Sequence, residues 1–194
     1  MIQPTPAMLS FLTVAVVASF VYAAVLGLYA LGMGILAFIE AGFRRRQDDA
    51  EDYQSVLESP YSIPVSIIAP SFNEEVMAVP VIRSLLAQAY PTTEVIAVDD
   101  GSTDGTLAAM IAAFDLEPRR VFYRTTLATK TVRMVYRSRT EPRLTVVSKD
   151  NGGKADALNC GVNFARYRYL CCVDGDTMFA PDAVLKAMTV ISKD

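Results

Sequence analysis

The sequence predicts an α/β domain with a largely parallel sheet, preceded by an N-terminal transmembrane helix. Three observations support this fold class. The first 39 residues contain no charged side chain, and residues 8–39 are almost wholly apolar or small. From residue 65 onward, short β-branched runs alternate with segments of helical spacing, as in sheets whose parallel strands are joined by helices. Polar segments with acidic residues follow three of these runs, at residues 71–75, 99–104 and 174–176, where parallel sheets bind their ligands.

The apolar segment is long enough to cross a bilayer, because about 20 apolar residues span roughly 30 Å of hydrocarbon. A cleavable signal peptide is shorter and begins with basic residues. Here the basic residues Arg44, Arg45 and Arg46 follow the apolar run instead. We therefore expect residues 1–46 to form a membrane anchor, with a helix over about residues 8–39. Because basic residues favour the cytoplasmic side, we expect a single-pass protein of the cell inner membrane, with its remaining residues in the cytoplasm.

Residues 47–62 are polar and acidic, which indicates a linker between the anchor and a domain over residues 63–194. The domain begins with a β-branched run over residues 65–69, and a proline ends the buried strand that this run predicts. Apolar side chains then recur at helical spacing in residues 79–89, which predicts a helix. Residues 94–98, with four apolar residues after Glu94, predict the next strand.

Residues 106–114 predict another helix, which Ser102 or Thr103 is expected to cap, because hydroxyl side chains are favoured at helix N-termini. The alternation then repeats, with a strand, a helix and a strand expected at residues 144–147, 154–165 and 169–173. A final helix is expected to open at Pro181, since proline is favoured in the first helical position. The pattern over residues 121–136 is ambiguous between helix and strand.

Composition excludes several classes of function. The 18 basic and 21 acidic residues give a formal net charge of −3. This argues against nucleic acid as a partner, because that binding draws on net positive charge. No histidine is present, so this chain holds neither a Ser-His-Asp nor a Cys-His catalytic site. Three cysteines are too few for a disulfide framework.

An acidic motif, Asp174-Gly175-Asp176, follows the strand expected at residues 169–173. In an extended segment, side chains two residues apart project to the same side. Two carboxylates placed in this way leave most of the coordination shell of Mg²⁺ or Mn²⁺ free for phosphate and water. Many turns contain the same pattern, but its position after a buried strand favours a metal site.

Two further motifs carry chemistry of their own. Asp99 and Asp100 follow the strand over residues 94–98, where an ordinary turn would use the same residue types. A carboxylate there can also accept a hydrogen bond from a ribose hydroxyl or from a uracil N–H. A Gly-Gly-Lys sequence that ends at Lys154 lacks the spacing of a P-loop and is more often a solvated turn. It can nevertheless place an ammonium group on a diphosphate, assisted by amides at a helix start.

A basic segment over residues 119–143 holds eight basic residues and one acidic residue. Two interpretations stay open. The segment docks on anionic lipid headgroups, where each basic residue gains about 1 kcal/mol, or it is a charged hairpin exposed to solvent.

Four motifs, in this order, resemble the family 2 glycosyltransferases. They are Pro70-Ser71-Phe72-Asn73-Glu74, the segment from Val98 to Thr106, the segment from Gly152 to Asn159, and Asp174-Gly175-Asp176 with Pro181-Asp182-Ala183. The likeness is strongest to the membrane-embedded processive synthases of hyaluronan, chitin and poly-N-acetylglucosamine. It covers about residues 63–194 and implies a GT-A fold, which is Rossmann-like, with a nucleotide-sugar donor and a divalent metal, Mg²⁺ or Mn²⁺.

The resemblance also implies a role for individual residues. The nucleotide-sugar site would be formed by Phe72, Glu74, Asp99, Asp100, Lys154 and Asp174. Within it, Asp100 with Asp99 would contact the nucleoside, and Lys154 would lie in the diphosphate region. Asp174 and Asp176 would hold the metal. Gly175 stands where the family usually has alanine, a change that we expect to be tolerated.

The family's general base and its Gln-x-x-Arg-Trp acceptor motif lie beyond Asp194, and this chain contains no tryptophan. We therefore expect a truncated chain, the donor-binding half of an inverting glycosyltransferase. Its partners would be the bilayer, a glycan acceptor, and a missing C-terminal half or partner membrane helices. UDP-N-acetylglucosamine is the favoured UDP-sugar donor and UDP-glucose the second choice. A membrane-anchored nucleotide-sugar-binding module without catalysis and a polyprenyl-phosphate glycosyltransferase are the alternatives.

Overall fold

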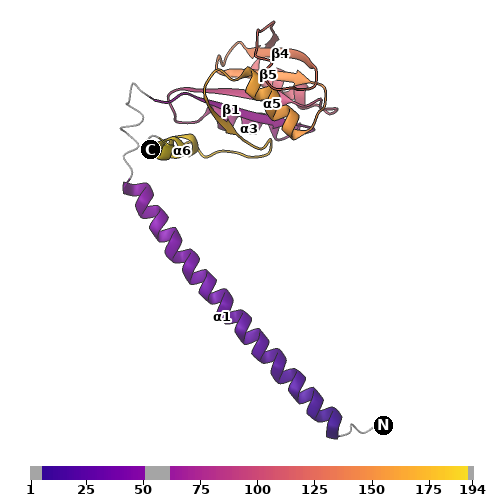
Figure 1. Ribbon diagram of the computed structural model, residues 1–194, viewed down its shortest axis with the longest axis vertical. Coiled ribbons are helices and arrows are strands. Elements are labelled where there is room, and N and C mark those ends of the chain that lie inside the picture. Colours follow the sequence, from indigo (N-terminus) through magenta and orange to yellow (C-terminus); the bar gives the residue numbers. More distant parts are fainter. Residues whose placement is uncertain (1–5, 51–61, 192–194) are drawn as a thin grey trace. The chain divides into compact units, whose positions relative to one another are not determined.

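The computed structural model describes residues 6–50 and 62–191. They form two separate units, the helix α1 (Pro6–Ala50) and an α/β domain (Figure 1). Helix α1 continues past the expected end at residue 39, so residues 47–50 of the expected linker are helical. The next part of that linker, residues 51–61, lies outside the described residues.

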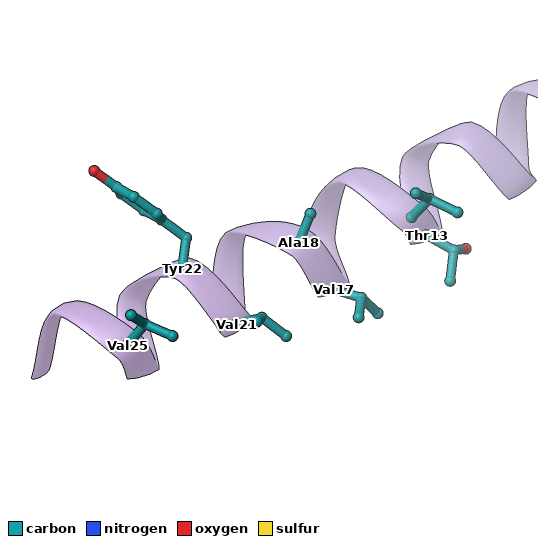
Figure 2. A pocket seen from close by; sticks show the side chains of 7 residues that line it. Thr13, Val17, Ala18, Val21, Tyr22 and Val25 are labelled. Atoms are coloured by element: carbon teal, nitrogen blue, oxygen red, sulfur yellow. The ribbon is translucent and has the colours of Figure 1, made fainter. Parts of the chain in front are cut away.

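The surface of α1 is apolar along most of its length. The stretch Leu9–Phe43 has 35 residues and a mean hydropathy of 2.3, and it is long and apolar enough to cross a membrane. At 1.5 Å per residue it covers about 50 Å. Within the described structure, no side chain in its most apolar window is buried. Figure 2 shows part of this surface, where Val17, Val21 and Val25 project from successive turns.

The domain is built on a six-stranded sheet in the order β3-β4-β5-β2-β1-β6. Four strands are parallel: β1 (Val65–Ser71), β2 (Thr93–Asp99), β5 (Leu144–Lys149) and β6 (Tyr169–Cys172). Two antiparallel strands complete the far edge: β3 (Leu116–Pro118) and β4 (Val132–Ser138). The expectation of a largely parallel sheet is confirmed, and the ambiguous segment at residues 121–136 ends in β4.

Helices cover both faces of the sheet (Figure 1). They are α3 (Ala78–Leu86), α4 (Thr106–Phe114), α5 (Lys154–Phe164) and α6 (Ala183–Ile191). Neighbouring residues of β1 point to opposite layers: Ile67 belongs to the core that α3, α4 and α6 complete, and Ile68 packs with α5. Because both faces of the central strands are buried, these strands are mostly apolar rather than alternating.

Helix α6 begins two residues later than expected. Pro181 and Asp182 form a turn in which the amide of Ala183 donates to the carbonyl of Ala180 (3.0 Å). The side chain of Gln88 then caps the helix, because its Oε1 accepts a hydrogen bond from the amide of Val184 (3.0 Å). A partner nearly a hundred residues away in sequence therefore fixes this helix start, rather than the local proline signal.

Candidate functional site

A cleft of about 460 Å³ lies at the carboxyl ends of the parallel strands. This edge is where open α/β sheets bind ligands. The last two residues of β1 and residues that follow β1, β5 and β6 line the cleft, together with the first turn of α5 and one residue that follows β2. They are Pro70, Ser71, Phe72, Glu74, Asp100, Asn151, Gly153, Lys154, Ala157, Asp174, Gly175 and Asp176. The cleft thus brings together six of the seven residues named from the sequence, and Asp99 is the exception.

Asp100 occupies the buried end of the cleft. Its carboxylate accepts hydrogen bonds from the amides of Gly152 (3.1 Å) and Gly153 (2.7 Å) and forms an ion pair with Lys149. The Nζ of Lys149 also contacts Asp156 in the first turn of α5 and the carbonyl of Asp150 (2.7 Å). The carboxylate of Asp100 is therefore engaged within the protein, where it holds the loop between β5 and α5.

Lys149 is fully buried between its two aspartates. Burial lowers the pKa of its ammonium, but hydrogen bonds and charge attraction from Asp100 and Asp156 offset burial, so the pKa lies above its ordinary value. The lysine is charged at neutral pH, and its charge compensates the carboxylates that surround it. We name Asp100, Lys149 and Asp156 the buried triad, after its two buried members, since Asp156 is partly exposed.

The conformation of Gly153 directs its amide toward the buried triad. Its φ is +85°, in the left-handed region that favours glycine. The structure corrects one expectation here, because the amides of Gly152 and Gly153 donate to Asp100 rather than standing free to assist a phosphate. Lys154 follows at once as the first residue of α5, and its side chain lines the cleft.

Asp99 lies behind the cleft. It is 2% exposed, and its carboxylate accepts hydrogen bonds from the hydroxyl of Ser148 (3.0 Å) and the amide of Ser102 (3.2 Å). These contacts join the ends of β2 and β5 and leave Asp99 outside the lining of the cleft. Asp99 therefore helps to fix the backbone next to Asp100 but does not face the cleft itself.

The expected cap of α4 is wrong. The helix begins at Thr106, too far along the chain for Ser102 or Thr103 to cap it, and Asp104 instead accepts from the amide of Thr106 (3.0 Å). A hydrogen bond from the Thr106 hydroxyl lowers the pKa of Asp104. The two hydroxyl residues bind Asn73 after β1: the Ser102 Oγ accepts from the Asn73 amide (3.0 Å), and the Thr103 amide donates to Asn73 Oδ1 (2.8 Å).

The opposite end of the cleft is exposed and acidic. Asp174 and Asp176 lie in a turn after β6, and both are exposed, whereas Gly175 between them is buried. Lys154 forms an ion pair with Asp174, and this hydrogen bond raises the pKa of the lysine. Asp176 has no ion pair within residues 62–191, so one carboxylate of the motif stays uncompensated.

Glu74 adds a third carboxylate near this end. Burial raises its pKa, and the charges of Asp176, Asp104 and Asp174 raise it further. Its Oε2 is buried and has no hydrogen-bond partner among the described residues. The carboxylate has room because residue 175 is a glycine, since a Cβ there would meet both Glu74 oxygens and the Pro70 carbonyl.

The donor set of this end suits an open divalent-metal site. The described residues contain no cluster of three or more His, Cys, Asp or Glu side chains that could hold an ion by itself. Mg²⁺ is commonly held by one or two carboxylates and completed by water and substrate phosphates. Asp174 and Asp176 supply these two carboxylates, and the orphaned Glu74 oxygen marks an excess of negative charge beside them.

Sequence reasoning missed Lys149, Ser148 and Asp156. The strand expected to end at residue 147 continues through both Ser148 and Lys149, whose side chains are buried. The sequence did contain a signal for Lys149, because this lysine ends an apolar strand directly before Asp-Asn-Gly-Gly. Its two carboxylate partners come from different elements, so the pairing depends on the fold.

The comparisons with known proteins agree with the family that the sequence motifs resemble. The sequence profile described as "Glycosyl transferase family 2" matches residues 66–129 and 128–194. The chain is 29% identical over 119 residues to a poly-beta-1,6-N-acetyl-D-glucosamine synthase of Staphylococcus epidermidis, covering 61% of this chain and 23% of that protein. It is 31% identical over 130 residues to a hyaluronan synthase of Pasteurella multocida, covering 67% and 11%. The chain thus spans a quarter or less of the length of these two relatives.

Two solved structures share the fold. One is S. aureus TarS 1–349, with a TM-score of 0.50 and 24% identity, covering 68% of this chain and 33% of that one. The other is the mannosyltransferase PcManGT from Pyrobaculum calidifontis, in complex with GDP-Man and Mn²⁺, with a TM-score of 0.51 and 23% identity over 79% and 42%. These likenesses confirm the GT-A fold that the sequence motifs implied.

Proposed function

Because the chain belongs to glycosyltransferase family 2, we propose that it forms the donor-binding part of an inverting glycosyltransferase that uses a UDP-sugar. The observation that carries this proposal is the single cleft with two unlike ends. One end holds a preorganised aspartate beneath a glycine loop, and the other holds two exposed carboxylates beside a lysine. A nucleoside diphosphate has matching parts, namely a hydrogen-bonding base and a multiply charged diphosphate.

The nucleoside would occupy the end of the cleft at Asp100 and Phe72. Phe72 is 48% exposed and lines the cleft, so its ring is available to pack against a base. Asp100 is already anchored by Lys149 and by two backbone amides, so little conformational freedom would be lost on binding. The buried end would therefore orient the donor.

The diphosphate would lie between Lys154 and the carboxylates Asp174 and Asp176, which would hold Mg²⁺ or Mn²⁺. Such an ion, when bound, neutralises negative charge on the departing diphosphate. The ammonium of Lys154 is already charged and exposed, and it would exchange its contact with Asp174 for phosphate oxygens. The base that takes the proton of the acceptor hydroxyl is proposed to come from outside these 194 residues.

UDP-N-acetylglucosamine is the donor that we favour, and a growing polysaccharide or glycan is the acceptor. The support comes from the poly-beta-1,6-N-acetyl-D-glucosamine synthase to which the chain is similar. In the proposed arrangement residues 1–46 anchor the protein, α1 spans the inner membrane once, and residues 63–194 bind the donor at its cytoplasmic face. The length and hydropathy of Leu9–Phe43 support the anchor.

Metal-dependent nucleotide binding tests the site. We expect the full chain in detergent to bind UDP with Mn²⁺ and to lose at least tenfold in affinity with a chelator, measured by isothermal titration calorimetry. Asp176→Asn should abolish the difference, because it removes one anionic ligand and changes the shape little. Asp115→Asn is the matched control, since Asp115 is exposed and lies outside the cleft. Equal binding by the parent with and without chelator would contradict the proposal.

Thiol labelling tests the orientation. Cys172 is exposed in the domain and serves as an internal reference. In intact cells an impermeant maleimide should label Thr5→Cys but leave Cys172 unlabelled until lysis. Labelling of Cys172 in intact cells would place the domain on the outer side and overturn the proposed topology.

A further inference from the structure

A second surface of the domain lies away from the cleft, on the loop between β3 and β4. Phe122 on this loop is fully exposed, at 105% of its reference surface. The next residue, Tyr123, is stacked on Phe164 of α5, with ring centroids 4.2 Å apart and an interplanar angle of 20°. Asn163 of α5 fixes the loop, because its side chain exchanges hydrogen bonds with the backbone of Leu127 (2.8 and 3.0 Å). The exposed ring is therefore carried on an anchored loop.

Arginines surround the exposed ring. Arg124 and Arg166 border the same hollow as Phe122 and Tyr123, and Arg120 precedes them in the loop. We name these five residues the Phe122 surface. Arg120 and Arg124 form no ion pair within residues 62–191, whereas Arg166 contacts the buried carboxylate of Glu94 (3.4 Å). The surface thus combines an uncovered aromatic ring with positive charge that its own domain leaves largely uncompensated.

The Phe122 surface and the cleft lie at opposite ends of α5. Lys154 and Ala157 line the cleft at the start of this helix, and the Tyr123–Phe164 stack lies at its end. An 11-residue helix is about 16 Å long. A partner on the Phe122 surface would therefore leave the cleft open to a donor.

We propose that the Phe122 surface rests on the anionic headgroups of the bilayer that α1 spans, with the Phe122 ring at the boundary between headgroups and acyl chains. Arginines are attracted to anionic lipids, and aromatic rings are favoured at this depth. The inference rests on the proposed function in one respect, since α1 must span the membrane. Given that span, the domain is held near the lipid surface, so the contact forms at a high effective concentration.

Contact with a lipid surface explains the composition of the loop better than the alternative, in which the loop is a charged hairpin exposed to solvent. A hairpin that only needs solubility gains nothing from a fully exposed phenylalanine between arginines. A lipid surface uses both features at once, because the arginines supply attraction and the ring supplies buried apolar area. The structure therefore favours the first of the two interpretations that the sequence left open.

The absence of tryptophan from the chain gives a direct test. Phe122→Trp introduces a single tryptophan, which can be excited selectively, into the full chain, and the chain is reconstituted in nanodiscs of phosphatidylcholine with or without phosphatidylglycerol. We expect its emission to shift to the blue, and brominated lipids to quench it, in the anionic discs and much less in the neutral ones. Val76→Trp is the matched control, because Val76 is 81% exposed and lies elsewhere on the domain. Its emission should be unaffected by brominated lipid.

Charge removal provides the second arm. Arg120→Gln and Arg124→Gln, in the Phe122→Trp background, should each lower the ratio of docked to free domain in anionic discs by about fivefold. The proposal is overturned if brominated lipid quenches Phe122→Trp no more than it quenches Val76→Trp, or if quenching is equal in neutral and anionic discs. A blue shift with a soluble anionic polysaccharide but not with lipid also overturns it, in favour of a polymer partner.

The outcome is distinguishable from failure of the proposed function. Stable incorporation of the full chain into nanodiscs, and resistance to extraction by alkaline carbonate, report on α1 alone. An incorporated Phe122→Trp chain whose fluorescence stays unquenched refutes the Phe122 surface as a lipid contact and leaves UDP binding untouched.

Discussion

The two ends of the cleft use the same pair of residue types in opposite surroundings. At the buried end, the side chain of Lys149 has no exposed surface and that of its partner Asp100 is 4% exposed. At the open end, the side chains of Lys154 and Asp174 are 62% and 59% exposed. Burial, rather than the pairing itself, therefore decides whether an ion pair stabilises the fold or can exchange one partner for another.

The physical reason lies in what happens when one partner is removed. A buried charge that loses its partner cannot be solvated, so the remaining charge is destabilised by several kcal/mol. An exposed charge is hydrated at once, and exposed pairs contribute little to stability. The buried triad is therefore suited to fixing the loop at Gly152 and Gly153, and the open pair can exchange partners at little cost, as the proposed binding of a diphosphate requires.

The largest effect is expected for Lys149→Met. The substitution leaves the buried carboxylate of Asp100 and the partly buried carboxylate of Asp156 without a cation, and it should lower the free energy of unfolding by about 3–5 kcal/mol. Urea denaturation of the full chain in detergent, followed by tyrosine fluorescence, measures this change. Adding Asp100→Asn should recover part of the lost free energy of unfolding, because it removes one of the two carboxylates that Lys149→Met leaves without a cation. If the free energy of unfolding fell by no more than for an ordinary surface substitution, the distinction between the buried and the open end of the cleft would be wrong.

A smaller loss is expected for Gly175→Ala at the open end. The added Cβ would meet the Glu74 carboxylate and the backbone carbonyl of Pro70, and only the first of these can move away. Overpacking of this kind costs about 1–3 kcal/mol. The same urea denaturation applies, and Glu74→Ala in the same chain should relieve part of the cost. Full tolerance of alanine would mean that Glu74 moves away freely and that the backbone at Pro70 also shifts, and it would contradict the expected loss.

Gly175 shows where the sequence was informative and where it was not. Its position in an acidic motif after a strand could be recognised, and the structure places that motif on the cleft. Its packing against Glu74 could not be recognised, because the two residues are a hundred positions apart and meet only when β1 and β6 pair. Local patterns identify the segment, and the fold determines its neighbours.

The helices and strands of the domain also differ in how well the sequence predicted them. Helix α4 has the bounds that the pattern predicted, 106–114, and each predicted parallel strand is present to within two residues at either end. The strands β1, β2 and β5 are buried on both faces, so their runs are mostly apolar, whereas β6 is largely exposed. Strand β4, which lies between β3 and β5, was ambiguous because it is half-exposed and carries arginines, which hide the strand pattern. The buried triad was missed because Lys149 finds its partners 49 residues before and 7 residues after itself.

The pH dependence of stability sharpens the comparison further. The pKa of Asp156 lies below its ordinary 3.8, because hydrogen bonds from Lys149 and from the Lys130 amide outweigh burial. A depressed carboxylate contributes stability above its unfolded pKa and loses it as the pH falls through its folded pKa. The raised pKa of Lys149 acts in the opposite sense, so its contribution is complete below 10.5 and is lost as the pH rises through its folded value.

The ion pair between Lys149 and Asp156 should therefore be intact between about pH 4 and pH 10 and weaken on both sides. Asp156→Asn should lower stability at neutral pH and flatten the decline below about pH 4, because the titrating carboxylate is gone. Thermal unfolding of parent and variant in detergent from pH 2.5 to 7 measures this. An identical acid limb in both proteins would show that Asp156 does not contribute to it.

The smallest effect on stability is expected for Lys154→Met, the open-end counterpart of Lys149→Met. The ammonium of Lys154 is hydrated, and Asp174 stays hydrated without it, so the urea midpoint should change too little to resolve. UDP binding should respond in the opposite way. Loss of a charged hydrogen-bond donor to the diphosphate should weaken it by about tenfold or more in the presence of Mn²⁺. Lys154→Arg keeps the charge and should restore part of the affinity, which a purely structural role would not require. If Lys154→Met instead unfolded the domain as readily as Lys149→Met, the open end would be part of the scaffold and the distinction between the two ends would fail.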